Sequence, residues 1–437
     1  MLPEQLYSIF LSHPQVFTDT RKVIPGGLFF ALKGPNFNGN AFAEAALQQG
    51  AAYAVVDEVR SGTDPRLIQV PDVLQTLQEL AHHHRMQFAI PVIGITGSNG
   101  KTTTKELMAA VCSQQYETLA TEGNLNNHIG VPLTLLRLRP QHQLAVIEMG
   151  ANHQGEIASY CVIAAPTHGL ITNVGKAHIE GFGGEEGVRK GKGELYAYLR
   201  QHNGTVFLHS DSEHLPQMAA GITHQITYGS GEADTISGRI HPSEEGLLRF
   251  EATVANQTAN IQTQLVGDYN FPNALAAIAV GTVVDIPLAV AASAIRQYQP
   301  DNSRSQQMAW GSNTLILDAY NANPTSMRSA ISAFAKRTSG TGIVWLGAMK
   351  EMGTESQSEH QSLLQFLRQW PWESVVVVGA EYEDLADATE RWFPDVSTAL
   401  ETFRNEPLPA EKTILLKGSR GSRMETLLSL LPESGES

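Results

Sequence analysis

The sequence predicts an α/β protein of three domains, and two observations lead to that prediction. The chain has 437 residues, which is too long for one ordinary domain and suggests about three. Short apolar runs typical of buried strands alternate with helical stretches along most of its length. The composition and hydrophobic pattern change near residues 85 and 300, so we expect domains at residues 1–85, 86–300 and 301–437.

The first domain is expected to be a small α/β unit. Its predicted elements are two strands and a helix, at residues 28–32, 52–57 and 41–49. Gly50 stands where a helix usually ends. His82, His83 and His84 fall on the helix that connects to the next domain. Adjacent positions do not share a helix face, so we expect a solvated surface there and no metal site.

The central domain is expected to be a P-loop-type ATPase domain with a mainly parallel sheet. The predicted strands include residues 88–95, 145–147 and 169–171, with a helix at residues 274–280. Ligands in such sheets bind at the carboxyl ends of the strands. Residues 205–264 are rich in Thr, Gln, Ser and Gly with weak alternation, so we expect a β-rich side layer there.

The third domain is expected to be Rossmann-like α/β. Residues 301–307 are polar and read as a linker. Four predicted strands follow, separated by helical stretches, at residues 315–317, 343–346, 375–378 and 413–416. This alternation predicts another parallel sheet.

The stretch at residues 94–107, GITGSNGKTTTKEL, predicts a phosphate-binding loop between a buried strand and a helix. Glycines let the backbone approach an anion, and the helix start favours negative charge. Lys101 would reach the outer phosphates and Thr102 would hold Mg²⁺. The glycines fall at Gly94, Gly97 and Gly100, so the strict Walker spacing, which needs a glycine at Ile95, is not met.

Composition excludes several classes of protein. The formal charge of −14 argues against nucleic acid as a partner, because proteins that coat a duplex are basic. The N-terminus lacks the basic region of a secretory signal, and no apolar run is long enough to span a bilayer. Cys112 and Cys161 are far apart and are expected to be buried thiols in a reducing cytoplasm.

Further polar residues follow predicted strands. Glu148 comes directly after an apolar run, where a second Mg²⁺ ligand belongs beside a phosphate loop. His178 also follows a strand, and residue chemistry alone leaves a structural role and a ligand role open. Lys190 and Lys192 read, on residue chemistry alone, as part of a basic surface turn.

Eight ordered blocks together resemble the Mur ligase family over nearly the whole chain. They are GITGSNGKTTTKEL, TEGNLNNHIGVPLTLL from Thr121, IEMGA from Ile147, NVGKAHIEGFG from Asn173, KGEL from Lys192, GDYNFPNALAA from Gly267, DAYNANPTSM from Asp318 and LLKGSRG from Leu415. The unusual glycine spacing is this family's own.

The resemblance implies an ADP-forming peptide ligase of peptidoglycan precursor synthesis. ATP would phosphorylate the terminal carboxylate of a UDP-N-acetylmuramoyl-tripeptide, and the amine of D-Ala-D-Ala would displace the phosphate. Both peptides would be the enzyme's partners, and we expect a cytoplasmic monomer without membrane insertion. Mg²⁺ and a carbamylated Lys192 are the implied cofactors beside ATP.

The resemblance also implies the roles of individual residues. The catalytic set is Lys101, Glu148, His178 and Lys192, of which Glu148, His178, the Lys192 carbamate and Thr102 would hold metal. Nucleotide contacts would come from Gly97, Ser98, Asn99, Gly100, Lys101, Thr102, Thr103, Asn273, Arg304 and Asp318. Substrate contacts would come from Thr20, Arg21, Asn38, Asn126, Asn127, Asn321, Lys417, Ser419 and Arg420.

Three motifs depart from the family's usual text, and none lies at the ATP end. Thr20 replaces a serine, Asn38 and Asn40 stand in a usual Asp-Gly-His, and Ala348 replaces an aspartate. Three alternatives stay open: a family ligase that adds a single amino acid, a non-catalytic nucleotide-binding homologue, and a nucleotide-driven switch. The ligase for the third residue commonly carries Asp-Asn-Pro-Arg, which this chain lacks.

Overall fold

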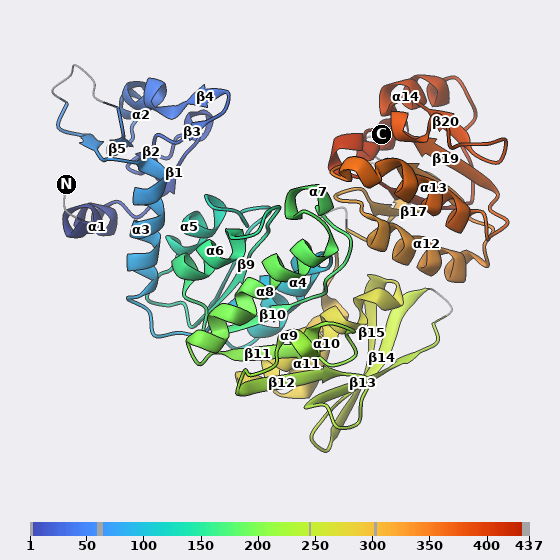
Figure 1. Ribbon diagram of the computed structural model, residues 1–437, viewed down its shortest axis with the longest axis horizontal. Coiled ribbons are helices and arrows are strands. Elements are labelled where there is room, and N and C mark those ends of the chain that lie inside the picture. The colour runs from blue at the N-terminus through green and yellow to red at the C-terminus, as the bar shows by residue number, and fades with distance from the viewer. Residues whose placement is uncertain (1–2, 59–63, 244–245, 301–303, 431–437) are drawn as a thin grey trace.

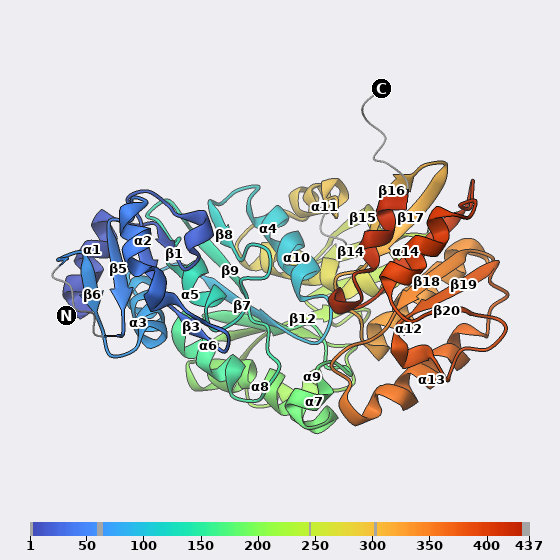
Figure 2. The ribbon, with the colours of Figure 1, turned by 90° about the horizontal axis from the view of Figure 1, so that it is seen from above.

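The computed structural model describes residues 3–58, 64–243, 246–300 and 304–430. The chain forms three units in a row, each built around its own sheet (Figures 1 and 2). The N-terminal and C-terminal units flank the central one. The predicted three-part α/β architecture is therefore confirmed.

The N-terminal unit holds a four-stranded parallel sheet in the order β1-β2-β5-β6 and a small hairpin, β3-β4. The strands are β1 (Val16–Phe17), β2 (Leu28–Phe30), β3 (Lys33–Gly34), β4 (Phe37–Asn38), β5 (Tyr53–Val56) and β6 (Leu67–Gln69). The helices are α1 (Pro3–Ser12), η1 (Thr20–Lys22), η2 (Gly39–Phe42), α2 (Ala43–Gln48) and α3 (Val73–Arg85).

Helix α3 connects this unit to the central one and packs against both (Figure 1). The solvated surface expected at His82, His83 and His84 is wrong for the last turn of this helix, because His84 is buried. The His84 ring is bonded to the Tyr7 hydroxyl at 3.1 Å and to the Leu138 carbonyl at 3.0 Å. Arg85 donates to the Ala164 carbonyl at 3.0 Å. These polar side chains lie inward because they satisfy carbonyl groups of the neighbouring unit.

The central unit holds a nine-stranded sheet in the order β15-β14-β13-β12-β11-β10-β7-β9-β8. The strands are β7 (Val92–Thr96), β8 (Thr118–Ala120), β9 (Leu144–Glu148), β10 (His168–Ile171), β11 (Thr205–His209), β12 (His224–Gly229), β13 (Ile236–His241), β14 (Leu247–Val254) and β15 (Gln257–Val266). The helices are α4 (Lys101–Cys112), α5 (Gly130–Leu135), α6 (Glu156–Ala164), α7 (Ile179–Phe182), α8 (Glu185–Gln201), α9 (Leu215–Met218), η3 (Asp268–Asn270), α10 (Phe271–Val283) and α11 (Leu288–Gln297).

In this order, all neighbouring strands from β13 to β8, including β7, pair in parallel. The pairs β13-β14 and β14-β15 are antiparallel. The expected β-rich segment at residues 205–264 is confirmed as strand-rich, but it does not form a separate layer. Its strands extend one edge of the central sheet. Residues 189–195, expected as a surface turn, lie inside helix α8.

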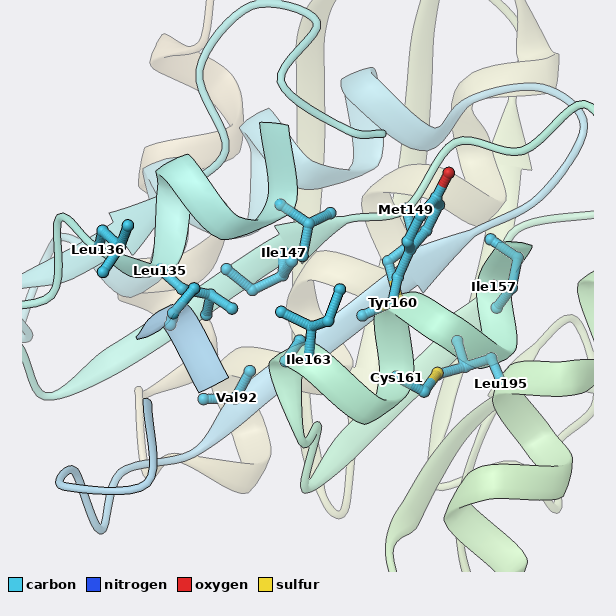
Figure 3. Close-up of a cluster of buried hydrophobic side chains, with 14 of the residues drawn as sticks. Val92, Leu135, Leu136, Ile147, Met149, Ile157, Tyr160, Cys161, Ile163 and Leu195 are labelled. Carbon is cyan, nitrogen blue, oxygen red and sulfur yellow. The ribbon is translucent and has the colours of Figure 1, made fainter. Parts of the chain in front are cut away.

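This unit has an apolar core on each face of the sheet, one against helices α5, α6 and α8 and the other against helices α4, α10 and α11. Val92, Leu135, Ile147 and Leu195 belong to the cluster shown in Figure 3. Tyr160 is also buried in it, and its phenol oxygen points out of the cluster. Cys112 and Cys161 are both buried free thiols, as expected.

The C-terminal unit holds a six-stranded sheet in the order β16-β17-β21-β18-β19-β20, parallel except for the pair β16-β17. The strands are β16 (Gln306–Trp310), β17 (Asn313–Asp318), β18 (Ile343–Gly347), β19 (Ser374–Val378), β20 (Arg391–Phe393) and β21 (Thr413–Lys417). The helices are α12 (Pro324–Thr338), η4 (Gly353–Glu355), α13 (Ser356–Leu367), η5 (Ala380–Tyr382), α14 (Val396–Arg404), η6 (Arg420–Ser422) and η7 (Met424–Leu430).

The expected linker at residues 301–307 is only partly a linker. Residues 301–303 lie outside the described residues, and Gln306 and Gln307 already belong to edge strand β16. Polar composition misled here because one face of an edge strand can remain solvated. Within the described residues, no helix combines the length and apolar character needed to cross a membrane.

Candidate active site

The phosphate loop lies between β7 and α4, and β7 is the third strand from one edge of the central sheet. Gly97 has φ +143°, and a Cβ there would lie 2.0 Å from Thr172 Oγ1. Gly100 has φ +80° and directly precedes α4. The Asn99 amide donates to Asn173 Oδ1 at 3.0 Å, which ties the loop to the end of β10. Only glycine fits these two positions, so the sequence dictates the loop's shape.

Lys101 begins α4 and curls back over this loop. Its Nζ donates to the Gly97 carbonyl at 2.7 Å and to the Ser98 carbonyl at 3.3 Å. Burial lowers the pKa of Lys101 to about 8, opposed by the Glu148 carboxylate and assisted by Arg304. A helix start with a lysine folded over a glycine turn is a site for polyphosphate.

Glu148 ends β9 and faces the start of α4. Its Oε1 accepts hydrogen bonds from Thr102 Oγ1 at 3.2 Å and from Asn126 Nδ2 at 2.8 Å. Its Oε2 is buried and has no hydrogen-bond partner among the described residues. A buried carboxylate oxygen without a partner is costly unless a cation completes it.

These residues fit a magnesium ion. Among the residues that the structure describes, no three His, Cys, Asp or Glu side chains gather as a ready-made metal cluster. Mg²⁺ does not require such a cluster, because it usually keeps waters and phosphate oxygens beside one or two carboxylates. The hydroxyl of Thr102 and the carboxylate of Glu148 are ligands of that type.

His178 belongs to the central unit but meets a residue of the C-terminal unit. Its Nδ1 lies against the carboxylate of Glu351, and this contact lowers the pKa of Glu351. Both residues line the same cavity as Lys101. The sequence placed His178 near the phosphate loop but gave no signal for Glu351.

Lys192 is 1% exposed, within α8. Burial, followed by the charge of Lys101, holds its pKa well below the usual value. Its Nζ donates to the Ala151 carbonyl at 3.1 Å and lies 4.8 Å from the centroid of the Phe182 ring. Lys190, two residues earlier, is exposed. Burial therefore favours, at Lys192, the neutral amine that carbamylation needs.

Asp318 and Lys417 end the neighbouring strands β17 and β21 in register. Lys417 Nζ donates to Asp318 Oδ2 at 2.6 Å. Nearby, the Tyr320 ring lies between two guanidinium groups, with Arg304 at 3.8 Å and Arg420 at 5.2 Å from its centroid. The C-terminal unit thus brings cationic side chains and the Asp318 carboxylate, in addition to Glu351, to the edge that faces the phosphate loop.

One cavity of about 590 Å³ gathers these groups from two units. The expected site residues that line it are Ser98, Asn99, Gly100, Lys101, Thr102, Thr103, Asn126, Asn127, Glu148, His178, Asn273, Arg304, Asp318, Asn321 and Lys417. Asn273 lies against the loop, where a Cβ on Gly100 would be 2.7 Å from its Oδ1.

Some expected site residues lie elsewhere. Gly97, Lys192, Ser419 and Arg420 are near the cavity but do not line it. Gly97 lies behind the loop, and Lys192 lies behind Ala151, which does line the cavity. Ser419 is buried, and its Oγ donates to the Ala322 carbonyl at 3.3 Å.

The substrate contacts expected in the N-terminal unit lie apart from the cavity. No residue of 3–58 or 64–85 lines the cavity. Arg21 is exposed and pairs with Asp19 at 2.7 Å. Asn38 Nδ2 donates to Glu58 Oε1 at 2.8 Å. The structure does not bring Thr20, Arg21 or Asn38 to the phosphate loop.

Several cavity residues were not anticipated from the sequence. They include Tyr269, Tyr320 and Glu351, and Asn323, which lies beside the loop, was not anticipated either. Asn323 could have been found, because an asparagine before a proline at a helix start is a capping signal. The other three carry no local signal, since their roles depend on the meeting of two units.

The fold and this site define a nucleotide-dependent enzyme whose phosphate loop is completed by a second domain. The chain belongs to the Mur ligase family. Its residues match three models of that family: "Mur ligase family, catalytic domain" over 15–85, "Mur ligase middle domain" over 95–281 and "Mur ligase, glutamate ligase domain" over 303–420.

Two curated relatives are similar over nearly their whole length, and both are named UDP-N-acetylmuramoyl-tripeptide–D-alanyl-D-alanine ligase. The Escherichia coli protein is 37% identical over 96% of this chain and 94% of its own length. The Bacillus subtilis protein is 34% identical over 96% and 93%.

Two solved structures share the fold. MurF from Acinetobacter baumannii has a TM-score of 0.87 at 30% identity, covering 98% of this chain and 97% of that one. MurF from Thermotoga maritima, solved in complex with ADP, has a TM-score of 0.85 at 25% identity, covering 96% and 97%.

Proposed function

We propose that this chain uses ATP to join D-alanyl-D-alanine to a UDP-N-acetylmuramoyl-tripeptide, forming ADP, phosphate and the pentapeptide precursor of peptidoglycan. The observation that carries the proposal is the shared cavity, in which the phosphate loop faces Asp318 and Lys417 of another unit. The relatives named above, similar over more than nine tenths of their length, support the substrate assignment.

The chain's own side chains suit the first half of the reaction. A tripeptide carboxylate must attack the γ-phosphorus of ATP, so two anions have to approach each other. The ammonium of Lys101 at the helix start offsets that repulsion. The carboxylate oxygen forms a bond to phosphorus while ADP leaves, which converts a poor acyl donor into an acyl phosphate. Mg²⁺, held by Thr102, Glu148 and His178, would supply further charge stabilisation when bound.

The second half is amide formation. The amine of the dipeptide attacks the acyl carbon, phosphate leaves, and the amine gives up a proton. Water has to be excluded, because it would hydrolyse the acyl phosphate. We propose that the C-terminal unit, through Lys417, Ser419 and Arg420, orients the dipeptide or the phosphate and closes the cavity.

We further propose that Lys192 is carbamylated. A lysine with an unperturbed pKa is neutral roughly once in a few thousand molecules at pH 7. The buried position of Lys192 favours the neutral amine that reacts with CO₂. The carbamate would offer two oxygens to a second Mg²⁺.

The remaining roles are proposed from the positions of the residues. Asn273 and Arg304 would contact adenine, and Asp318 the ribose. Asn126, Asn127 and Asn321 line the cavity and would contact the peptide. Thr20, Arg21 and Asn38 would bind the UDP end, which suits a substrate long enough to reach from one unit to the next. We take residues 1–85, 86–300 and 301–437 as the three domains, acting in one cytoplasmic monomer.

A phosphate-release assay tests the proposal. Phosphate should appear only when ATP, the tripeptide nucleotide and D-Ala-D-Ala are all present, and mass spectrometry should detect the new amide. Replacement of the dipeptide by single amino acids should give no product. ATP hydrolysis without the muramoyl nucleotide, or ligation of a free amino acid, would overturn the assignment.

A further inference from the structure

The contact between His178 and Glu351 joins two units at the cavity. His178 directly precedes α7 of the central unit, and Glu351 lies between β18 and η4 of the C-terminal unit. The imidazole Nδ1 lies against the carboxylate of Glu351. A carboxylate accepts hydrogen bonds, so its position beside Nδ1 favours the neutral tautomer with the proton on Nδ1 and the lone pair on Nε2.

Apolar packing fixes the two residues relative to each other. Ile179, which follows His178, is buried in the same hydrophobic cluster as Met349 and Met352, which flank Glu351. A Cβ on Gly353 would lie 3.3 Å from the Cβ of Glu180, so α7 and η4 pack closely. The contact is therefore set by a docked interface and is not a chance meeting of long side chains.

The backbone at both positions adopts an unfavourable conformation. His178 has φ +52° and Glu351 has φ +63°, in the left-handed region that side chains rarely adopt. Such residues persist when surrounding structure determines them, and they gather at functional sites. Both side chains line the cavity that holds Thr102 and Glu148.

We infer that Glu351 is a positioning residue that orients His178 toward a divalent cation held with Thr102 and Glu148. The carboxylate accepts a hydrogen bond from the Nδ1–H group and leaves Nε2 as the coordinating nitrogen, as carboxylates do behind metal-binding histidines. This inference rests on the metal role proposed above for His178. It adds that the C-terminal unit supplies the support.

A consequence is that docking of the C-terminal unit and cation binding strengthen each other. Docking of the C-terminal unit orients His178 for coordination and so raises the affinity for the cation. By linkage, the bound cation favours the docked arrangement by the same factor. Another cross-unit ion pair, Lys176 with Glu359 at 2.8 Å, offers a matched comparison. It bridges the same two units, but it lies outside the cavity lining.

The test measures Mn²⁺ binding to the full chain with ADP, from the electron paramagnetic resonance signal of free Mn²⁺. Glu351→Ala should weaken Mn²⁺ binding about 10-fold. In Glu351→Gln the amide oxygen still accepts a hydrogen bond from Nδ1–H, so the Mn²⁺ affinity should stay within about threefold of wild type. Glu359→Gln should weaken Mn²⁺ binding much less than Glu351→Ala does, because it removes only a partly exposed ion pair between the units. Circular dichroism melting confirms that each variant is folded.

Each contrary result has a distinct meaning. Wild-type affinity in Glu351→Ala would overturn the inference. Equal losses in Glu351→Gln and Glu351→Ala would overturn it in favour of direct coordination by the carboxylate. A matching loss in Glu359→Gln would show that docking alone matters. If His178→Ala itself binds Mn²⁺ normally, the metal role proposed for His178 fails instead.

Discussion

Asn99 of the phosphate loop and Asn323 of the C-terminal unit are joined through their side-chain amides across 224 residues of sequence. Asn323 Nδ2 donates to Asn99 Oδ1 at 2.7 Å. Asn323 Oδ1 also accepts from the Ser326 amide at 2.9 Å, which caps helix α12. One side chain therefore starts a helix in one unit and holds the nucleotide loop of another.

Substitution of Asn323 should separate these two tasks. Asn323→Ala removes both and should lower the free energy of unfolding by about 1 kcal/mol through the lost cap. Asn323→Ser can still cap the helix but is too short to pair with Asn99. We expect both variants to lower kcat, whereas only the alanine variant loses stability. Urea unfolding and steady-state kinetics measure the two effects, and full activity in Asn323→Ser would contradict the link.

Lys101 should make nucleotide affinity depend on pH. Burial lowers its pKa to about 8 in the nucleotide-free protein, and phosphate binding favours the protonated form. ADP affinity should be nearly constant below pH 8 and should fall toward about tenfold per pH unit above it, by linkage. Calorimetric titrations between pH 6.5 and 9.5 measure this.

The stability of the nucleotide-free protein should depend on pH in the opposite direction to its ADP affinity. Since burial holds the pKa of Lys101 in the folded protein below its ordinary value of 10.5, the nucleotide-free protein should gain stability from this group as pH rises from about 8 to 10.5. Lys101→Ala should lose ATP turnover and the pH dependence of affinity. Lys336→Ala, whose side chain is 73% exposed and lies outside the cavity lining, is the control. Unchanged turnover in Lys101→Ala would show that this loop is not the phosphate site.

Carbamylation should be visible at Lys192 and absent at Lys190. With ¹³C-bicarbonate, the protein should give a carbamate carbon signal in the NMR spectrum, retained in Lys190→Ala and lost in Lys192→Ala. The signal should disappear on acidification, because the amine is then protonated. Lys192→Ala should also abolish ligation while the circular dichroism spectrum stays unchanged. Near wild-type turnover in that variant would remove the assignment.

Gly97→Ala should disable the phosphate loop. The added Cβ meets Thr172 Oγ1 at 2.0 Å, beyond the cost of a positive φ. Gly183→Ala is the matched control, because Gly183 also has a positive φ of +75° but nothing within 4 Å of an added Cβ. The control should lose about 1–2 kcal/mol of stability. Gly97→Ala should lose more stability than the control. ADP should also fail to raise the melting temperature of this variant, although it raises that of wild type.

Most of the candidate site could be predicted because it depends on short, local sequence. The phosphate loop, Glu148 after β9 and His178 after β10 all follow buried strands, whose carboxyl ends meet at one edge of a parallel sheet. His84 and residues 189–195 were misjudged. His84 is held inward by a carbonyl 54 residues away, and residues 189–195 continue helix α8 despite two glycines and three basic residues.

The sequence by itself determined the three-domain architecture, the glycine loop and the capping residue that starts α12, because each follows from local conformational preference and periodicity. Only the tertiary structure decided that Glu351 meets His178, that Lys192 is buried while Lys190 is exposed, and that the N-terminal candidates lie apart from the cavity. The physical reason is that these outcomes depend on packing between units and on the desolvation it causes. A single stretch of sequence carries neither.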